Sequence, residues 1–271
     1  MRFSIVTPSY NQARFIEKTI QSVLNQRYPD FEHIVMDGGS TDGTIEILKK
    51  YPHLRWKCER DRGQADAINK GLKMATGEIL AWINSDDYYL LGAFERVAKA
   101  YQDARKPDII FGDVLVVTEA DRAIARRRSL PYDYRMLLLG TNYIQQPAVF
   151  FTRDALEEVG YLDETLHYAL DWDLWLRFGR AGMRFKLVQA PLAALRWHKG
   201  AKSFAQRSQM AADTRRVRDR YWSEVARKRG FAANLLLPLL RSYYILKVET
   251  VKLTLRGVVD FLPLRLVSAR R

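Results

Sequence analysis

The sequence predicts an α/β fold in which helices cover a mostly parallel sheet, followed by a basic helical tail. Short apolar runs alternate with segments of helical periodicity, and this alternation predicts the sheet and its helices. The distribution of charge predicts the tail. Residues 1–200 contain 28 basic and 26 acidic residues, whereas residues 201–271 contain 16 and 5. The tail therefore carries a net charge of +11 out of +13.

The first half of the chain repeats strand and helix patterns. We expect strands at residues 3–7, 31–36, 54–58 and 78–83. We expect helices at residues 15–24, 44–50 and 65–75, and the segment 88–100 also has a helical pattern. Repeated strand–helix units give parallel strands, and ligands bind at the carboxyl ends of such strands.

The second half is less regular. Residues 108–118 and 123–127 resemble a hairpin, 148–152 a strand, 171–179 a helix and 185–196 another strand. From about residue 204 the pattern is helical and basic. We therefore divide the chain into a domain at 1–203 and a tail at 204–271.

Polar clusters follow three successive strands, at residues 7–11, 37–42 and 84–87. The last cluster contains Asp86 and Asp87, whose adjacent carboxylates repel each other unless a cation neutralises them. Mg²⁺ typically takes one or two carboxylates together with phosphate oxygens. The alternative is a helix cap for residues 88–100. Because the pair falls in a series of strand-end clusters, we favour a cation and a diphosphate.

Composition excludes other kinds of site. The single cysteine, Cys58, excludes an internal disulfide and a multi-cysteine zinc site, and the four histidines are far apart in sequence. The first residues do not resemble a secretory signal, and the longest apolar run, at 235–240, is far shorter than the ~20 residues that span a bilayer. We therefore expect a cytoplasmic protein.

Four motifs appear in order: Thr-Pro-Ser-Tyr-Asn at 7–11, Asp-Gly-Gly-Ser-Thr-Asp-Gly at 37–43, residues 61–71, and Trp-Ile-Asn-Ser-Asp-Asp at 82–87. Together the motifs resemble those of the family 2 glycosyltransferases, which use nucleotide sugars and have the three-layer α/β/α GT-A fold. The resemblance covers roughly residues 1–205. It implies a nucleotide-binding half at about 1–105 and an acceptor and catalytic half at about 106–203.

The resemblance also implies roles for individual residues on the donor side. The side chains expected to contact the nucleotide sugar are Thr7, Pro8, Tyr10, Asp37, Asp61, Asp86, Lys199 and Lys202. Tyr10 would stack on the base and Asp86 would contact the ribose. The two lysines would contact the diphosphate, and the alternative is that they are surface lysines. Asp87 and His198 are the implied ligands of Mn²⁺ or Mg²⁺, and the alternative for His198 is a structural or exposed histidine. In the family's Asp-X-Asp element the first aspartate is here replaced by Asn84 or Ser85.

The second half of the chain contains the catalytic residue that the resemblance implies. Residues 168–177 resemble the family's Glu-Asp element, with Leu170 in place of the glutamate. Inverting transfer needs one carboxylate to deprotonate the attacking hydroxyl, and the resemblance assigns this role to Asp171. The alternative is that Asp171 and Asp173 only cap the helix that follows. Residues 145–147 resemble an acceptor-side segment.

The tail combines basic clusters with aromatic and aliphatic side chains, a combination that suits a helix lying at a membrane surface. The alternatives are packing on the domain or on a second subunit, which would make an oligomer. We do not expect nucleic acid as a partner, because the apolar content of the tail is high and the sugar-nucleotide motifs already account for the domain.

These observations predict an inverting, metal-dependent glycosyltransferase. The expected donor is a UDP-sugar, with a dTDP-sugar as the alternative. The expected acceptor is a hydroxyl of a glycan or lipid-linked molecule in cell-surface polysaccharide synthesis, at the inner face of the plasma membrane. The rival hypothesis is a non-catalytic nucleotide-sugar-binding module recruited to membranes by its tail. A nucleotidyltransferase would need a glycine-rich phosphate loop after the first strand, and residues 8–11 do not form one.

Overall fold

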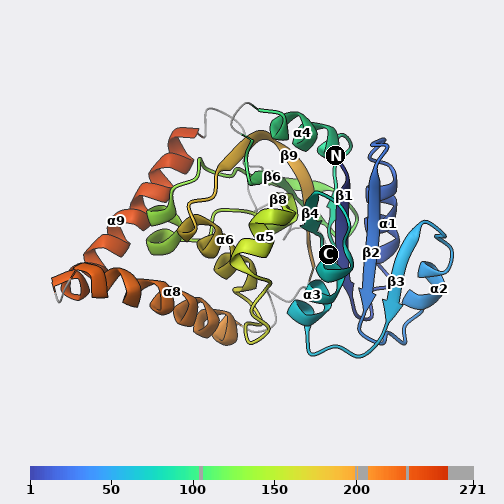
Figure 1. Ribbon diagram of the computed structural model, residues 1–271, viewed down its shortest axis with the longest axis horizontal. Coiled ribbons are helices and arrows are strands. Elements are labelled where there is room, and N and C mark those ends of the chain that lie inside the picture. Colours follow the sequence, from blue (N-terminus) through green and yellow to red (C-terminus); the bar gives the residue numbers. More distant parts are fainter. Residues whose placement is uncertain (104–105, 199, 201–206, 230–231, 256–271) are drawn as a thin grey trace, which may run out of the picture.

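One mixed sheet of nine strands forms the centre of the molecule in the computed structural model, which describes residues 1–103, 106–198, 200, 207–229 and 232–255 (Figure 1). The strand order is β3-β2-β1-β4-β8-β6-β9-β5, and β7 pairs with β6. The strands are β1 (Phe3–Ser9), β2 (Phe31–Asp37), β3 (Leu54–Cys58), β4 (Ile79–Trp82), β5 (Tyr88–Tyr89), β6 (Ile109–Thr118), β7 (Ala123–Arg127), β8 (Val149–Thr152) and β9 (Phe185–Trp197).

The first half forms the parallel part of the sheet, in which β3, β2, β1 and β4 are neighbours. Every residue of β1 is buried, because helices cover both faces of the strand. Val6 packs with α3 (Gln64–Met74) on one face, and Phe3 packs with Val23 of α1 (Ile16–Leu24) on the other. Close contact requires a glycine at position 71, where a Cβ atom would lie 2.4 Å from Val6 Cγ1. The expected α/β layers are confirmed.

In the second half the direction of the strands changes. Strand β8 is antiparallel to both β4 and β6, while β6 and β9 are parallel. Helix α6 (Leu170–Arg180) covers this region and stacks Trp175 on Trp82 of β4, with ring centroids 5.5 Å apart. The remaining short elements are α2 (Thr44–Leu48), α4 (Ala93–Tyr101), η1 (Met136–Gly140), η2 (Gln146–Ala148) and α5 (Arg153–Val159).

Residues 88–100 do not form the single helix that their sequence pattern predicts. Tyr88 and Tyr89 form the short strand β5 against Ala194 and Ala193 of β9, and the helix begins only at Ala93. Gly92, with φ of +78°, provides the left-handed turn between them. The pairing holds the Asp86–Asp87 turn against the carboxyl-terminal end of β9.

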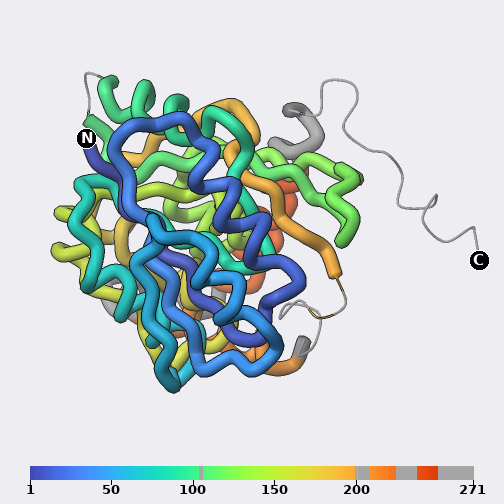
Figure 2. The backbone as a smooth tube through the Cα atoms, turned by 90° about the vertical axis from the view of Figure 1, so that its right-hand side faces the viewer, coloured from blue at the N-terminus to red at the C-terminus, as the bar shows by residue number. Residues whose placement is uncertain are grey.

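In the described residues after the sheet, the structure has the helices α8 (Arg207–Arg229) and α9 (Ala232–Leu255). They lie at the opposite end of the molecule from β3 and α2, and behind the N-terminal half when the molecule is viewed from that half (Figures 1 and 2). Val217, Tyr221 and Trp222 of α8 and Tyr244 and Val248 of α9 are buried in the same apolar cluster as α6. Within the described residues, no helix is both long and apolar enough to cross a membrane.

Candidate active site

The loops after β1 and β2 are hydrogen-bonded to each other at the carboxyl ends of these strands. Asp37 ends β2, and its carboxylate accepts bonds from the N–H groups of Gly39 and Ser40, at 3.0 and 2.7 Å, and from the Ser40 hydroxyl. Ser40 Oγ in turn accepts the N–H of Asn11, at 2.7 Å. These bonds fix the backbone on one side of a cavity.

That cavity, of about 340 Å³, is the candidate nucleotide pocket. It is lined by side chains from the expected donor set, including Pro8, Tyr10, Asp61 and Asp86. Tyr10 is 62% exposed, so its ring is available for stacking. The backbone at Gly38 passes close to the same residues: a Cβ there would lie 2.6 Å from Asp61 Oδ2 and 3.4 Å from Tyr10 Cδ2.

Two members of the expected donor set lie behind this pocket rather than in its lining. Thr7 is fully buried, and its hydroxyl lies 2.9 Å from His33 Nε2. Asp37 is also buried, and both of its carboxylate oxygens bond the loop that follows. In the structure these two residues support the pocket. Lys199 and Lys202 lie outside the described residues.

Asp86 and Asp87 lie where the nucleotide pocket meets β9. Asp87 is buried, and its Oδ1 accepts the backbone N–H of Arg196 at 2.8 Å. Burial and the neighbouring Asp86 raise the pKa of the Asp87 carboxyl well above its usual range. His198 Nε2 lies 3.0 Å from Asp86 Oδ2. The structure thus places Asp86, the expected ribose contact, next to His198, one of the two expected metal ligands.

The possible metal ligands at this turn fit a divalent cation in part. Two adjacent carboxylates and one imidazole are ligands that Mn²⁺ or Mg²⁺ accepts, and such ions usually take further ligands from substrate phosphates and water. In the part of the chain that the structure describes, no three His, Cys, Asp or Glu side chains are grouped so that they alone could hold a metal ion. A cation bound here would need oxygens of the donor's diphosphate.

A second cavity, of about 330 Å³, continues from the first and shares Gln64, Asn84 and Asp86 with it. Its far side is lined by Asn142, His167, Tyr168, Asp171 and Met210. The two cavities form one continuous cleft, with the nucleotide pocket at one end and Asp171 at the other. The second cavity has room for the transferred sugar and the acceptor group.

Asp171 is positioned by two hydrogen bonds. Asn142 Nδ2 donates to Oδ2 at 3.1 Å, and the Trp172 N–H donates to Oδ1 at 2.8 Å. The residue is half-buried, and desolvation of its carboxyl raises the pKa to about 6. The N-cap of α6 is Ala169, and no side chain makes a cap hydrogen bond there. The helix-cap alternative for Asp171 is therefore not observed.

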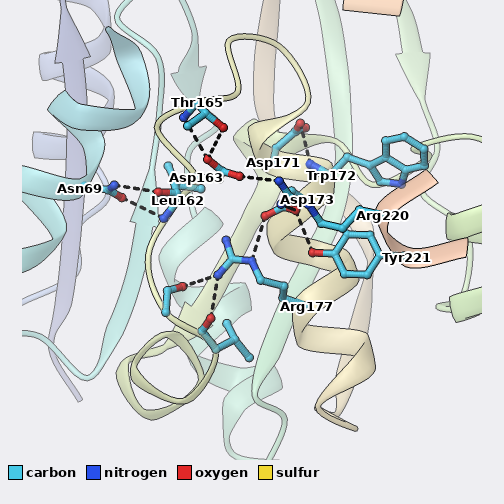
Figure 3. Close-up of polar contacts among 12 residues, drawn as sticks. Asn69, Leu162, Asp163, Thr165, Asp171, Trp172, Asp173, Arg177, Arg220 and Tyr221 are labelled. Carbon is cyan, nitrogen blue, oxygen red and sulfur yellow. Dashed lines mark hydrogen bonds and ion pairs between the residues drawn. The ribbon is translucent and has the colours of Figure 1, made fainter. Parts of the chain in front are cut away.

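Asp173 has a different environment from Asp171, although it is only two residues away. It is fully buried outside the cleft and bonds Arg177, Arg220 and Tyr221 (Figure 3). Of the two aspartates, only Asp171 lines the cavity. Residues two positions apart on a helix do not share a face, which accounts for this separation.

Sequence reasoning placed Asn84 in the Asp-X-Asp element and Gln146 in the expected acceptor-side segment, but it missed Gln64 and Asn142 of the same cleft. Gln64 Nε2 donates to Asn84 Oδ1 at 2.7 Å, and Asn84 Nδ2 donates to Gln146 Oε1 at 3.3 Å. This row of amides lies where the two cavities meet. Gln64 was visible within the motif at 61–71, but no local pattern distinguishes Asn142, which comes from an irregular loop.

Arg196 was also missed, although it precedes the assigned His198. Its backbone N–H bonds Asp87, its Nε donates to Asp86 O at 2.9 Å, and its Nη1 lies 2.9 Å from Asp121 Oδ1. The residue is 5% exposed. It ties β9 to the carboxylate turn and to the turn between β6 and β7. Arg127 and Met210 also line the second cavity and were not assigned from the sequence.

Comparisons with known proteins agree with this geometry. The family model "Glycosyl transferase family 2" matches residues 4–160. A PGL/p-HBAD biosynthesis glycosyltransferase of Mycobacterium tuberculosis is 31% identical over 181 residues, which are 65% of this chain and 68% of that protein. The putative teichuronic acid biosynthesis glycosyltransferase TuaG of Bacillus subtilis is 35% identical over 138 residues, 48% of this chain and 55% of that protein.

Solved structures share the fold. Staphylococcus aureus TarS 1–349, in complex with UDP-GlcNAc, has a TM-score of 0.61 at 22% identity, over 80% of this chain and 65% of that one. The mannosyltransferase PcManGT of Pyrobaculum calidifontis, in complex with GDP-Man and Mn²⁺, has a TM-score of 0.59 at 21% identity, over 95% of this chain and 76% of that one. At these identities the likeness shows the fold alone.

The sequence motifs, the cleft and the family match lead to one conclusion. The motifs lie along the donor end of a cleft in an α/β fold of the GT-A type, and the matched residues make up more than half of the 271. The expected resemblance and the expected enzyme class are confirmed. The chain belongs to glycosyl transferase family 2, and it is a glycosyltransferase.

Proposed function

We propose that the protein is an inverting transferase that moves a sugar from a nucleoside-diphosphate sugar, with a UDP-sugar as the expected donor, to a hydroxyl of a glycan or lipid-linked acceptor. One observation carries the proposal. A continuous cleft joins the nucleotide pocket to a carboxyl group, on Asp171, whose pKa is raised to about 6. A general base works best when its pKa lies close to the working pH, and this value meets that condition.

Asp171 performs the proton transfer in this proposal. Its ionised carboxylate takes the proton of the acceptor hydroxyl while the hydroxyl oxygen attacks the anomeric carbon. The bond from that carbon to the diphosphate oxygen breaks, and the nucleoside diphosphate leaves with the bonding electrons. The bond from Asn142, at 3.1 Å, keeps one carboxylate oxygen oriented. One base and a single displacement invert the configuration.

Asp87 and His198 would hold Mn²⁺ or Mg²⁺ next to the diphosphate, whose oxygens would complete the set of ligands, while Asp86 would contact the ribose. The cation would act as a Lewis acid that stabilises the charge of the leaving group. The chain's own contribution is orientation: Arg196 fixes the Asp87 carboxylate through its backbone N–H, and Asp86 fixes the His198 ring. Lys199 and Lys202, in the same segment of sequence, stay the predicted contacts of the diphosphate.

The acceptor and its location are also part of the proposal. The names of the two relatives refer to PGL/p-HBAD biosynthesis and to teichuronic acid biosynthesis, which supports an acceptor in cell-surface glycan synthesis. Helix α9 exposes Leu239, Tyr243 and Leu246, which are 68, 57 and 66% exposed and lie on one helix face. Together with the basic charge of the tail, this apolar face supports peripheral contact with the anionic inner face of the plasma membrane.

A donor screen tests the proposed function. The protein is incubated with UDP-, dTDP- and GDP-sugars and Mn²⁺, and the released nucleoside diphosphate is measured. We expect slow release from one donor, and little release by Asp171→Asn, while calorimetry gives a similar affinity of both proteins for UDP. UDP binding without turnover of any donor would instead favour the binding-module hypothesis. Absence of both binding and turnover would reject the nucleotide pocket.

A further inference from the structure

Helix α8 is in contact with the segment that carries the proposed base. Its buried residues Val217, Tyr221 and Trp222 belong to the same apolar cluster as Trp172 and Trp175 of α6. Met210, near the beginning of α8, lines the second cavity together with Asp171. A helix expected to be part of an appendage therefore forms part of the wall of the cleft.

The first polar connection between α8 and α6 is remote from the cleft. Asp173 Oδ1 accepts bonds from Arg220 Nη1 at 3.0 Å and Tyr221 Oη at 2.8 Å, and Oδ2 accepts a bond from Arg177 Nε at 2.9 Å. Arg220 also bonds Asp163 Oδ2 at 2.9 Å, on the loop before α6 (Figure 3). This buried network joins the two helices and explains why α8 has a fixed position.

The second connection reaches the lining of the cleft itself. Asp213 is 4% exposed, and its Oδ2 accepts the backbone N–H groups of both His167 and Tyr168, at 2.9 and 3.0 Å. Both residues line the second cavity, and they precede Asp171 by four and three positions. One carboxylate oxygen thus fixes two consecutive peptide groups of the wall that faces the acceptor.

We propose that Asp213 is a positioning residue of the transfer reaction: from α8 it holds the His167–Tyr168 backbone so that this wall and Asp171 keep their geometry. The proposal rests on the proposed function. Without the carboxylate, two peptide N–H groups lose their acceptor, and the loop relaxes towards other partners. A displacement of about 1 Å at a reacting group can cost ~10²-fold in rate.

The proposed role of Asp213 predicts different effects on donor binding and on turnover. Asp213 contacts the wall near Asp171, while the nucleotide pocket is formed by Tyr10, Asp61 and Asp86 at the other end of the cleft. Loss of Asp213 should therefore lower kcat and raise KM for the acceptor, but leave donor affinity unchanged. A residue that only stabilises the fold would lower the active fraction without such a split.

Three substitutions and one control test this proposal. Asp213→Ala removes the acceptor oxygen, Asp213→Asn keeps an oxygen that can accept both N–H bonds, and Asp213→Glu keeps the charge but is longer by one methylene. The control is Asp219→Ala on the same helix, whose side chain is 60% exposed and touches Arg218 rather than the loop. Each full-length variant is assayed for thermal unfolding, UDP affinity, and transfer from the donor that the parent protein uses.

We expect Asp213→Ala to lower kcat by ~10- to 100-fold, with UDP affinity within twofold of the parent. Asp213→Asn should restore at least half of kcat, Asp213→Glu should lower kcat at least fivefold, and Asp219→Ala should match the parent. Parental kinetics in both Asp213→Ala and Asp213→Glu would overturn the proposal. If Asp213→Ala does not fold, parental kinetics in Asp213→Glu alone would do so. An inactive parent protein would instead reject the proposed function.

Discussion

In the proposed mechanism, the desolvation of Asp171 favours activity at the expense of stability. Because the folded protein raises its pKa from 3.8 to about 6, the folded state binds this proton more tightly than the unfolded state. The associated stability is fully present below pH ~4 and is lost as the pH rises through 6. Above pH 6 the ionised carboxylate is available as a base, and the same ionisation destabilises the fold.

Asp171→Asn should therefore have opposite effects on rate and stability. We expect transfer to fall ~10²–10⁴-fold, because the amide cannot accept the proton. We expect the free energy of unfolding to rise by about 1–3 kcal/mol at pH 8 and the gain to shrink towards pH 4. Urea denaturation at both pH values measures the gain, and an equal effect at both would contradict the assigned pKa. In the parent protein, kcat should fall below pH 6.

Gly38 gives a second test at the scale of one residue. A Cβ at this position would lie 2.6 Å from Asp61 Oδ2, so Gly38→Ala should displace Asp61 and the neighbouring Tyr10. We expect UDP affinity, measured by calorimetry, to fall at least tenfold. The control is Gly77→Ala, where a Cβ would lie 2.7 Å from Arg2 O, far from the cleft. That variant should lose thermal stability while its folded fraction binds UDP as the parent does.

At the scale of elements, α9 has two apolar faces with different surroundings. Tyr244 and Val248 face η1 and are buried, and a Cβ at Gly140 of η1 would lie 3.1 Å from Val248 Cγ2. Leu239, Tyr243 and Leu246 are exposed. The inner face stabilises the fold, so deletion of the whole helix would confound membrane binding with loss of stability. Point substitutions separate the two effects.

Replacing Leu239, Tyr243 and Leu246 together by serine should leave thermal unfolding within ~2 °C of the parent. It should remove most co-sedimentation with phosphatidylglycerol vesicles, because the basic charge alone binds weakly and in a salt-sensitive way. Val248→Ala should have the converse effect, a loss of about 1–3 kcal/mol of stability with vesicle binding retained. Parental vesicle binding by the triple variant would show that this face does not contact the membrane.

The helices and strands also show how much of the fold could be predicted from the sequence. The parallel strands β1 to β4 and the helices between them follow from apolar runs and helical periodicity that are continuous in sequence. Strand β5 was missed because two residues carry no period, and only its pairing with β9 makes it a strand. Asn142 was missed because it meets Asp171 across 29 positions, and no local pattern encodes such a contact.

At the scale of the whole molecule, the cleft concentrates carboxylates in a chain of net charge +13. Asp86, Asp87 and Asp171 all line the second cavity. A divalent cation bound at Asp87, beside Asp86, should stabilise the folded state, since its charge offsets the repulsion between these adjacent carboxylates. We expect 1 mM Mn²⁺ with UDP to raise the melting temperature by several degrees, and EDTA to abolish both this rise and the transfer.

Asp87→Ala should remove most of the response to Mn²⁺, and Asp154→Ala is the control, on a helix whose residues line neither cavity. Differential scanning fluorimetry with and without Mn²⁺ measures the effect. Full activity of the parent in EDTA would reject the metal site but leave the assignment of Asp171 intact.

The bond between Arg196 and Asp87 joins residues separated by 109 positions, and His198 meets Asp86 across 112. During synthesis on the ribosome, the segment with Tyr10 and Asp61 emerges long before the residues that order the carboxylate turn. A nascent chain therefore has its base pocket before it has its catalytic turn. We therefore expect the proposed donor site to be complete only after β9 has left the exit tunnel and paired with β5, and a chain that ends before β9 to lack turnover.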